Sequence, residues 1–454
     1  MGFLAGRDVL VAGAGVTGRS AAEALLAAGA SVTVTDGSAD RLSALEPLLP
    51  GVALVPGLVA PPSSAELVVT SPGWRPDSPL LVASRAAGLD VIGEVELAWR
   101  MGLELADPPA WLAVTGTNGK TTTVGMLESV LRAAGIDAVA CGNVGLPVVD
   151  ALLAGHRVLA VELSSFQLHW SPSVRPAAGV LLNLAEDHLD WHGSFAAYAE
   201  AKAQVLTGDV AVAGVDDPYV AELLSASPSP AHVGFTLGAP EEGQLGVVDG
   251  NLVDRAFGPD AVLASVSDVH PAGPPGVADA LAAAALARAH GVSAEAVRRG
   301  LRDFRPGAHR AEVVAVSDGV TYVNDSKATN PHAASASLRS YESVVWVAGG
   351  LLKGASVEEL VRAEAFRLRG AVLIGADREV IAASLAKYAP SVPVAVLEDA
   401  TMRDAVRAAR SMARAGDAVV LAPAAASMDM FTDYAHRGQA FAEAVRELTG
   451  QSQP

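Results

Sequence analysis

The chain has 454 residues, of which 51% are hydrophobic, and its formal net charge is −18. This length exceeds what one hydrophobic core supports, so it predicts a globular protein of about three domains. The acidic balance argues against a nucleic-acid partner, which needs a basic face on the protein. A single cysteine, Cys141, excludes an internal disulfide and a metal site built from cysteines.

The N-terminal stretch leads directly into "RDVLVAGAG", which is typical of a strand followed by a glycine turn. We find no cationic leader with an apolar segment and a cleavage site before it. No uninterrupted apolar run reaches the ~18 residues expected of a membrane-spanning helix. We therefore expect a cytoplasmic monomer with no stable insertion into a membrane.

Short β-branched runs alternate with alanine-rich helical stretches from end to end, a pattern typical of βα units around parallel sheets. We predict an α/β fold of three domains. These are a Rossmann-like domain at residues 1–100, a central P-loop-type ATPase domain with a mostly parallel sheet at 101–306, and a second Rossmann-like domain at 307–454. Pro306 and Gly307 break the pattern at the last boundary. Residues 208–277 are irregular and proline-rich, and their strands stay unassigned.

The first glycine loop, "GAGVTG" at residues 13–18, follows a strand and opens a helix, and Asp36 ends the next strand. Such a loop brings backbone amides at a helix start close to a phosphate-bearing ligand. That ligand is either a dinucleotide, which would make the chain a nicotinamide-dependent oxidoreductase, or the diphosphate of a nucleotide sugar. The structural alternative is that the glycines only let helix and strand pack closely.

A second loop, "GTNGKTTT" at residues 116–123, lies between the strand-like "WLAVT" and a helix-like run. It is shorter than the full phosphate-binding pattern, whose first glycine would fall at Val114. It still predicts nucleoside triphosphate binding, with Lys120 reaching the β- and γ-phosphate oxygens and Thr121 holding Mg²⁺. Only five of the 32 basic residues are lysine. Lysine is retained here because the wide fork of arginine does not enter a loop closed around a phosphate chain. A plain turn is the alternative.

At this second loop the sequence resembles the Mur ligases, ATP-dependent enzymes that form amide bonds in peptidoglycan synthesis and are related to folylpolyglutamate synthetase. The resemblance covers nearly the whole chain and rests on "VELSSFQL", "NLAEDHLDWHGSFAAYAEAK", "GAHRAE", "NDSKATN" and "PAAASMDMFTDYAHRG". Within the family, the first glycine loop, "SPG" at residues 71–73 and "NDSKATN" at residues 324–330 are similar to the branch that adds D-glutamate. The "DYAH" at residues 433–436 lies far beyond the place of a similar motif in the other branches, so we treat it as coincidence.

The resemblance implies a reaction. ATP phosphorylates the carboxylate of UDP-N-acetylmuramoyl-L-alanine, and the amine of D-glutamate attacks the acyl phosphate through a tetrahedral intermediate that expels phosphate. The implied cofactors are ATP, two Mg²⁺ ions, and CO₂ as a lysine carbamate. The alternatives are a family member with another amino-acid acceptor, the nicotinamide-dependent oxidoreductase, and a nucleotide-binding protein with reduced catalysis.

The resemblance also implies roles for individual residues and names the three domains by their ligands, the UDP-substrate, ATP and the amino acid. Catalysis is assigned to Lys120, Glu162, His188, Lys202 and Lys353. ATP binding is assigned to Gly116, Thr117, Asn118, Gly119, Lys120, Thr121, Thr122, Asn143 (near the adenine), Arg310 and Asp325. UDP-substrate binding is assigned to Gly15, Val16, Thr17, Asp36, Ser71, Pro72 and Gly73. D-Glutamate binding is assigned to Lys327, Thr329, Ser427 and Tyr434. Magnesium is assigned to Thr121, Glu162, His188 and Lys202 as its carbamate.

Simpler interpretations exist for three of these residues. Taken alone, Glu162 is a cap or an ion-pair partner, His188 a core histidine, and Lys202 a helix lysine on the rim with its ammonium in water. Lys202 follows two aromatic residues at helical spacing in "FAAYAEAK", which predicts shielding from water. Burial lowers the pKa of an amine and so raises the neutral fraction that adds CO₂. Lys387 in "LAKYAP" is interpreted as an ordinary surface residue.

One segment departs from the family pattern. Relatives usually show G-x-H-N-x-x-N-A at the start of a helix, where this chain has "GPPGVADA" at residues 273–280. Pro275, Gly276 and Asp279 replace the histidine and the two asparagines. An aspartate accepts hydrogen bonds but cannot donate them as an amide does, which predicts weaker ATP binding or an altered substrate.

Overall fold

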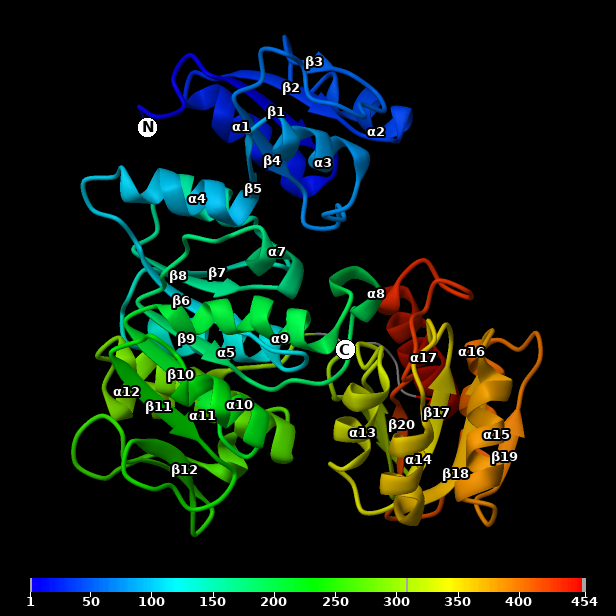
Figure 1. Ribbon diagram of the computed structural model, residues 1–454. Coiled ribbons are helices and arrows are strands. Elements are labelled where there is room, and N and C mark those ends of the chain that lie inside the picture. Colours follow the sequence, from blue (N-terminus) through cyan, green and yellow to red (C-terminus); the bar gives the residue numbers. More distant parts are fainter. Residues whose placement is uncertain (1, 308, 451–454) are drawn as a thin grey trace. The chain divides into compact units, whose positions relative to one another are not determined.

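The computed structural model describes residues 2–307 and 309–450 (Figure 1). It contains three sheets flanked by helices, and most neighbouring strands are parallel. This architecture confirms the predicted three-domain α/β fold. The contacts separate two compact units. One contains the chain up to Asp268 together with Ala278–Phe304, and the other contains Val269–Val277 together with the chain from Arg305 onward.

The first sheet has five parallel strands in the order β3-β2-β1-β4-β5. Its strands are β1 (Asp8–Ala12), β2 (Ser31–Thr35), β3 (Ala53–Leu54), β4 (Leu67–Thr70) and β5 (Asp90–Gly93). Its helices are α1 (Val16–Ala27), α2 (Ala39–Leu45), α3 (Pro79–Ala86) and α4 (Glu94–Leu103). The apolar runs of β1 and β4 are buried, as parallel strands covered by helices require. Glycine is needed at residue 18, because a Cβ there would collide with the carbonyl group of Gly13.

The second sheet has nine strands in the order β14-β13-β12-β11-β10-β9-β6-β8-β7. The parallel part contains β6 (Ala110–Thr115), β7 (Ala138–Gly142), β8 (Val158–Glu162), β9 (Ala178–Leu181), β10 (Val210–Gly214), β11 (Ala231–Phe235) and β12 (Gln244–Val248). β13 (Asn251–Asp254) and β14 (Ala261–Ser265) extend it as antiparallel strands. Strands β10 to β14 therefore occupy the segment whose strands the sequence left unassigned.

The helices around the second sheet include those that carry the predicted site. They are α5 (Lys120–Ala133), α6 (Val148–Leu153), α7 (Ser165–His169), α8 (Leu189–His192), α9 (Phe195–Ala203), α10 (Pro218–Ser225), α11 (Pro274–Ala289) and α12 (Ala294–Asp303). Ser164 caps α7 and Ser194 caps α9, each by accepting a backbone N–H of the first turn. Local capping thus defines where the helices next to the predicted site begin.

The third sheet has six strands in the order β15-β16-β20-β17-β18-β19, of which only β15 is antiparallel to its neighbour. The strands are β15 (Glu312–Ser317), β16 (Val320–Asn324), β17 (Val344–Gly349), β18 (Leu368–Ile374), β19 (Val394–Val396) and β20 (Ala418–Leu421). The helices are α13 (Pro331–Leu338), α14 (Glu358–Glu364), α15 (Arg378–Tyr388), α16 (Met402–Met412) and α17 (Tyr434–Thr449). Trp346 belongs to one apolar cluster and Val345 and Val347 to another, as alternation along a strand requires.

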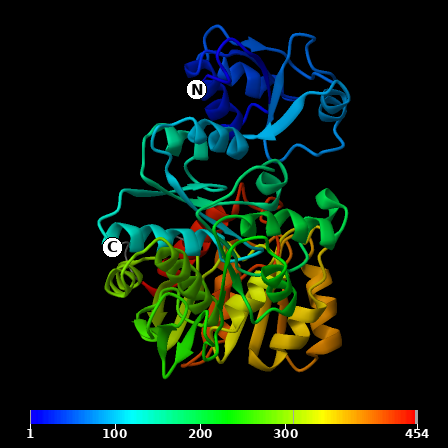
Figure 2. The same cartoon turned by 60° about the vertical axis from the view of Figure 1, so that its left-hand side comes forward.

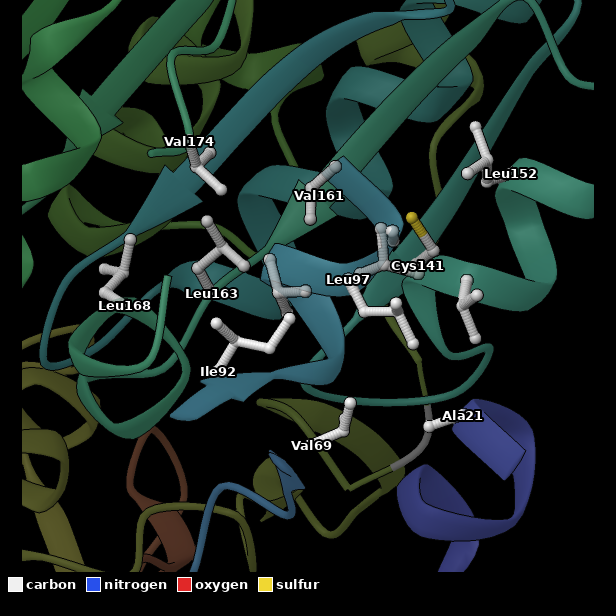
Figure 3. Packing of buried hydrophobic residues seen from close by; sticks show 14 of the residues in the cluster. Ala21, Val69, Ile92, Leu97, Cys141, Leu152, Val161, Leu163, Leu168 and Val174 are labelled. Atoms are coloured by element: carbon white, nitrogen blue, oxygen red, sulfur yellow. The ribbon is translucent and has the colours of Figure 1, made fainter. Parts of the chain in front are cut away.

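The first two sheets share one hydrophobic cluster (Figure 3). Val69 of β4 and Ala21 of α1 belong to it together with Cys141 of β7 and Val161 of β8. Helix α4 lies between the two sheets in both views and contributes Leu97 (Figures 1 and 2). This shared core explains why the two sheets form one compact unit. The predicted domain boundary at residue 100 falls within α4, and the boundaries at 100 and 306 stay predictions.

A buried carboxyl group lies at the start of α4. Glu94 is 2% exposed, and its Oε1 accepts the backbone N–H of Val149 at 2.6 Å, so it caps the first turn of α6. Burial raises the pKa of Glu94 to about 7, although the N–H groups of α6 oppose this effect. The neutral form is therefore favoured in the folded protein below about pH 7.

We expect Glu94→Gln to gain stability over the wild type as the pH rises from about 5 to about 8. A carboxyl group whose folded pKa exceeds its unfolded value of 4.5 stabilises the fold below that value, and this contribution is lost as the pH rises through about 7. The loss is roughly 3 kcal/mol at most, and glutamine, which stays neutral, does not suffer it. Melting temperatures at both pH values test this. Glu46→Gln, at an exposed position, is the control, and an equal shift at both pH values contradicts the prediction.

Candidate active site

The loop predicted to bind phosphate, at residues 116–119, joins β6 to α5 in the strand–loop–helix order that such a loop requires. Gly119 has φ +85 and turns the chain into the first turn of α5. Lys120 folds back over the loop, where its Nζ donates to the carbonyl oxygens of Gly116 and Thr117 at 2.9 Å each. The start of α5 and the ammonium group of Lys120 therefore create a positive site for an anion. Asn118, Thr121 and Thr122 complete the predicted set at this place.

Glu162 ends β8, which lies next to β6, and it pairs in register with Val114. It is 3% exposed, and the side-chain amide of Asn143 donates to its Oε1 at 2.9 Å. The backbone N–H of Asn143 also donates to the carbonyl oxygen of Glu162. The carboxylate is thus held by Asn143 at the same sheet edge as the phosphate-binding loop. A contact of Asn143 with the adenine stays a prediction.

Lys202 on α9 is 2% exposed, so the alternative of a lysine on the rim is wrong. Its Nζ donates to the carbonyl oxygen of Gly116 at 2.8 Å and lies 4.9 Å from the ring centroid of Tyr198. Burial lowers the pKa of Lys202 well below its ordinary value, and the nearby charge of Lys120 lowers it further. A neutral amine bonded to the phosphate-binding loop is the form that adds CO₂.

His188 precedes α8 with φ 54, in the left-handed region. Its ring centroid lies 4.6 Å from that of Phe166, and its Nε2 lies 3.6 Å from Asp187 Oδ2. The side chain is 47% exposed, so the alternative of a core histidine is wrong. Partial burial lowers the pKa of His188 against the opposing effect of Asp187, and Lys202 lowers it further. A neutral imidazole is the form that binds a metal ion.

The first glycine loop joins β1 to α1. Asp36 is buried, and its Oδ2 accepts the backbone N–H of Ala14 at 2.8 Å, so this carboxylate orients the loop itself. The Oγ of Ser71 is buried, has no hydrogen-bond partner among the described residues, and faces Gly13. The structure therefore brings the "SPG" segment, which continues with Pro72 and Gly73, next to the glycine loop that contains Gly15, Val16 and Thr17.

The residues predicted to bind D-glutamate lie in the other compact unit, after neighbouring parallel strands of the third sheet. They are Lys327 and Thr329 after β16, Ser427 after β20, and Tyr434 at the start of α17. Lys353, which is predicted to be catalytic, follows β17. The Nζ of Lys327 lies 5.2 Å from the ring centroid of Tyr434. Because adjacent parallel strands end at the same sheet edge, these residues gather there.

Two residues predicted to bind ATP also lie in this second unit. The Oδ1 of Asp325 accepts the backbone N–H of Ala311 at 3.3 Å, next to Arg310. Burial raises the pKa of Asp325, and the charge of Arg310 opposes this effect. The pair is thus electrostatically coupled, and its contact with ATP stays a prediction.

The sequence analysis missed Arg437, which is 1% exposed on α17. Its guanidinium donates to the Oγ of Ser326 at 3.0 Å and to the carbonyl oxygens of Ser326 at 2.9 Å, Ala425 at 3.0 Å and Gly349 at 3.4 Å. It therefore ties together the segments after β16 and β20, which carry Lys327, Thr329 and Ser427, and the end of β17, which precedes Lys353. A sequence signal was present, because Arg437 stands one helical turn before the buried Phe441, on the apolar face of an amphipathic helix.

Family models of three Mur ligase domains match successive parts of the chain. The Mur ligase MurD-like N-terminal domain matches residues 7–93, the Mur ligase middle domain matches residues 114–285, and the Mur ligase glutamate ligase domain matches residues 309–425. A relative in Nocardia farcinica, named UDP-N-acetylmuramoylalanine--D-glutamate ligase, is 55% identical over 468 residues, which cover 98% of each chain. The chain belongs to the Mur ligase family.

Other relatives of this Mur ligase carry the same name. The protein from Streptomyces coelicolor is 55% identical, and the one from Mycolicibacterium smegmatis is 52% identical, with 98% of this chain covered in each case. The shares of those relatives that are covered are 98% and 97%. The agreement therefore extends over all three sheets rather than over one domain.

Solved structures share the fold of this Mur ligase. UDP-N-acetylmuramate-alanine ligase from Thermotoga maritima has a TM-score of 0.58 and 18% identity, covering 97% of this chain and 99% of that chain. MurF from Acinetobacter baumannii has a TM-score of 0.57 and 20% identity, covering 78% and 79%. Identities this low show the fold alone. Within residues 2–307 and 309–450, none of the helices combines the length and apolar character needed to span a membrane.

The segment that departs from the family pattern lies against the phosphate-binding loop of this Mur ligase. Asp279 is in α11 and is 7% exposed. Its carboxylate faces Gly119 so closely that a Cβ at that glycine would collide with Oδ1. Residue 279 therefore lies at the predicted nucleotide site. Its carboxylate places a negative charge where an anionic ligand is expected.

We expect Asp279→Asn to lower the Michaelis constant for ATP several-fold, because the substitution removes a charge that repels the phosphates. Two unit charges ~6 Å apart repel each other by roughly 3 kcal/mol at an effective dielectric of ~20, before screening by salt. Initial rates at varied ATP test this. Asp303→Asn, whose side chain is 65% exposed, is the control. An unchanged Michaelis constant in Asp279→Asn contradicts the prediction.

Proposed function

We propose that this Mur ligase adds D-glutamate to UDP-N-acetylmuramoyl-L-alanine at the expense of ATP, by way of an acyl phosphate. The observation that carries the proposal is the 52–55% identity, over nearly the whole chain, to relatives named for that reaction. The chain's own "NDSKATN" at residues 324–330 supports the same amino acid. The comparisons give no support to a nicotinamide-dependent oxidoreductase.

The first unit supplies the groups for phosphoryl transfer. Lys120 and the start of α5 bind the phosphates of ATP, because they create a positive site at a helix N-terminus. The first glycine loop binds the diphosphate of the UDP-substrate, and the buried Ser71 Oγ, which has no hydrogen-bond partner among the described residues, lies directly against that loop. The carboxylate of the UDP-substrate then attacks the terminal phosphate of ATP, and the acyl phosphate and ADP result.

The donors at this place fit magnesium. Within the described residues, no three His, Cys, Asp or Glu side chains are arranged to hold a metal ion by themselves. Glu162 offers a buried carboxylate and His188 an imidazole whose pKa is lowered, and Thr121 adds a hydroxyl group. This set suits Mg²⁺, which is usually shared between one or two carboxylates and the phosphates of a substrate. When bound, Mg²⁺ neutralises charge on the phosphoryl group in transfer.

Lys202 is proposed as the carbamate. Its burial favours the neutral amine, which adds CO₂ and loses a proton to give a carbamate anion. The product replaces a cation by an oxygen ligand, the type that Mg²⁺ prefers. This proposal accounts for a lysine that is completely buried beside a phosphate-binding loop.

The second unit supplies the site for the amino acid. Lys327 offers a cation for a carboxylate of D-glutamate, and Thr329, Ser427 and Tyr434 offer hydroxyl groups at the same sheet edge. Lys353 follows the neighbouring strand β17 and is assigned to catalysis. The amine of D-glutamate attacks the acyl phosphate, and phosphate leaves from the tetrahedral intermediate. A cytoplasmic location and a monomeric state stay predictions.

The test is product identification with a panel of acceptors. The protein is supplied with ATP, Mg²⁺, UDP-N-acetylmuramate or UDP-N-acetylmuramoyl-L-alanine, and one amino acid at a time, and the product is identified by its mass. We expect D-glutamate with UDP-N-acetylmuramoyl-L-alanine to be the preferred pair. Faster turnover of UDP-N-acetylmuramate with L-alanine would refute the proposal.

A further inference from the structure

The loop after β4, residues 71–77, contains an arginine, Arg75, that reaches a distant part of the chain. Arg75 pairs with Asp77 through two hydrogen bonds, from Nε to Oδ1 at 3.0 Å and from Nη2 to Oδ2 at 3.2 Å. Its remaining nitrogen, Nη1, donates to the backbone carbonyl oxygen of Asp190 at 2.8 Å. The hydrogen bonds to Asp77 raise the pKa of Arg75, so the guanidinium stays charged and oriented. The contact joins the first sheet to helix α8.

Helix α8 is the turn that places His188. The backbone N–H groups of Trp191 and His192 both donate to the carbonyl oxygen of His188 at 3.1 Å, so the turn and His188 move together. Trp191 packs against the apolar cluster of the first sheet, as does Trp74 from the loop. The turn is therefore held to the first sheet at two points, the Asp190 carbonyl group and the Trp191 ring.

The other end of the loop contacts the first glycine loop. The backbone N–H of Ser71 donates to the carbonyl oxygen of Ala12, and the ring of Trp74 approaches Gly13. The backbone N–H of Trp74 donates to the carbonyl oxygen of Ser71. One short loop thus touches both the place proposed for the UDP-substrate and the turn that carries His188.

We propose that Arg75 is a positioning residue that couples the two sites, so that the UDP-substrate at the glycine loop orders His188 at the nucleotide site. The inference rests on the proposed function. An exposed arginine–aspartate pair by itself stabilises a fold very little, so stability alone does not account for this arrangement. Coupling through the Asp190 carbonyl group gives the pair a role in catalysis, because ordering of His188 only with the correct substrate limits wasteful cleavage of ATP.

The test measures the linkage between two ligands. The dissociation constant of ADP with Mg²⁺ is determined by calorimetry without and with saturating UDP-N-acetylmuramoyl-L-alanine, in the wild type and in Arg75→Ala. We expect the UDP-substrate to tighten ADP binding by about fivefold or more in the wild type, and the ratio to fall close to one in Arg75→Ala. The value of kcat should fall about tenfold, with the Michaelis constant for D-glutamate unchanged.

Arg157→Ala is the matched control, because Arg157 and Asp107 form an exposed ion pair of 2.6 Å elsewhere in the same unit. This variant should keep the wild-type ratio. Asp77→Asn removes the charged partner of the guanidinium but leaves Arg75 in place, so the ratio of the two ADP dissociation constants should be intermediate. This variant also tests the inference if Arg75→Ala does not fold. An equal ratio in Arg75→Ala and the wild type, or a ratio of one in the wild type, overturns the inference. The binding ratio needs no turnover, so failure to ligate D-glutamate would count against the proposed function alone.

Discussion

Replacing Lys202 by alanine is expected to remove nearly all amide-bond formation, a loss of at least about 100-fold in kcat. The reason is the position of the side chain, which is fully buried and bonded to the carbonyl oxygen of Gly116 in the phosphate-binding loop. As a carbamate this residue supplies an oxygen ligand, and alanine supplies none. Product formed under saturating ATP and both other substrates is the measurement.

Two further variants separate the carbamate from a merely structural lysine. A short carboxylic acid such as acetate should partly restore Lys202→Ala, because it fills the vacated ligand position. Lys202→Arg should stay inactive, because arginine forms no carbamate and remains cationic. Lys387→Ala, which removes a lysine that is 60% exposed, should keep full activity. Full activity in Lys202→Arg would rule out the carbamate.

Replacing Arg437 by methionine is expected to lower the stability of the second unit and to raise the Michaelis constant for D-glutamate. The substitution leaves the carbonyl oxygens of Ser326, Ala425 and Gly349 without their buried donor. Each unsatisfied buried acceptor costs about 1–3 kcal/mol, so the free energy of unfolding should fall by roughly 3 kcal/mol or more. Because two of these segments carry Lys327, Thr329 and Ser427, which are proposed to bind D-glutamate, its Michaelis constant should rise by about tenfold or more.

The measurements are the melting temperature and the Michaelis constants for D-glutamate and ATP. The constant for ATP should change less, because Arg310 and Asp325 are the only residues predicted to bind ATP that lie in this unit, and the phosphate-binding loop lies in the other. Arg403→Met removes an exposed arginine that is paired with Glu447 and serves as the control. An unchanged melting temperature together with an unchanged constant for D-glutamate would show that Arg437 does not hold these segments.

Local sequence was enough to define the fold class and the two glycine loops. β-Branched runs and a glycine next to a helix start can be recognised within a few residues, and the structure has buried strands and tight turns at these places. Lys120 could likewise be assigned from its neighbours alone, since its role depends on the loop that contains it. Strands β10 to β14 could not be placed from the sequence, because they are short and lie towards one end of the sheet, where pairing with neighbouring strands decides the structure more than the propensity of each segment.

The sequence by itself determined the family of this protein and its α/β architecture, and it predicted the residues that bind ATP. Only the tertiary structure decided how those residues are held. The burial of Lys202, the bond from Asn143 to Glu162 and the anchoring role of Arg437 all arise between segments far apart in the chain. Arg75 reaches a carbonyl group 115 residues away. Local patterns report propensity and periodicity over a few residues, whereas burial, pKa shifts and long-range hydrogen bonds depend on which segments the sheets bring together.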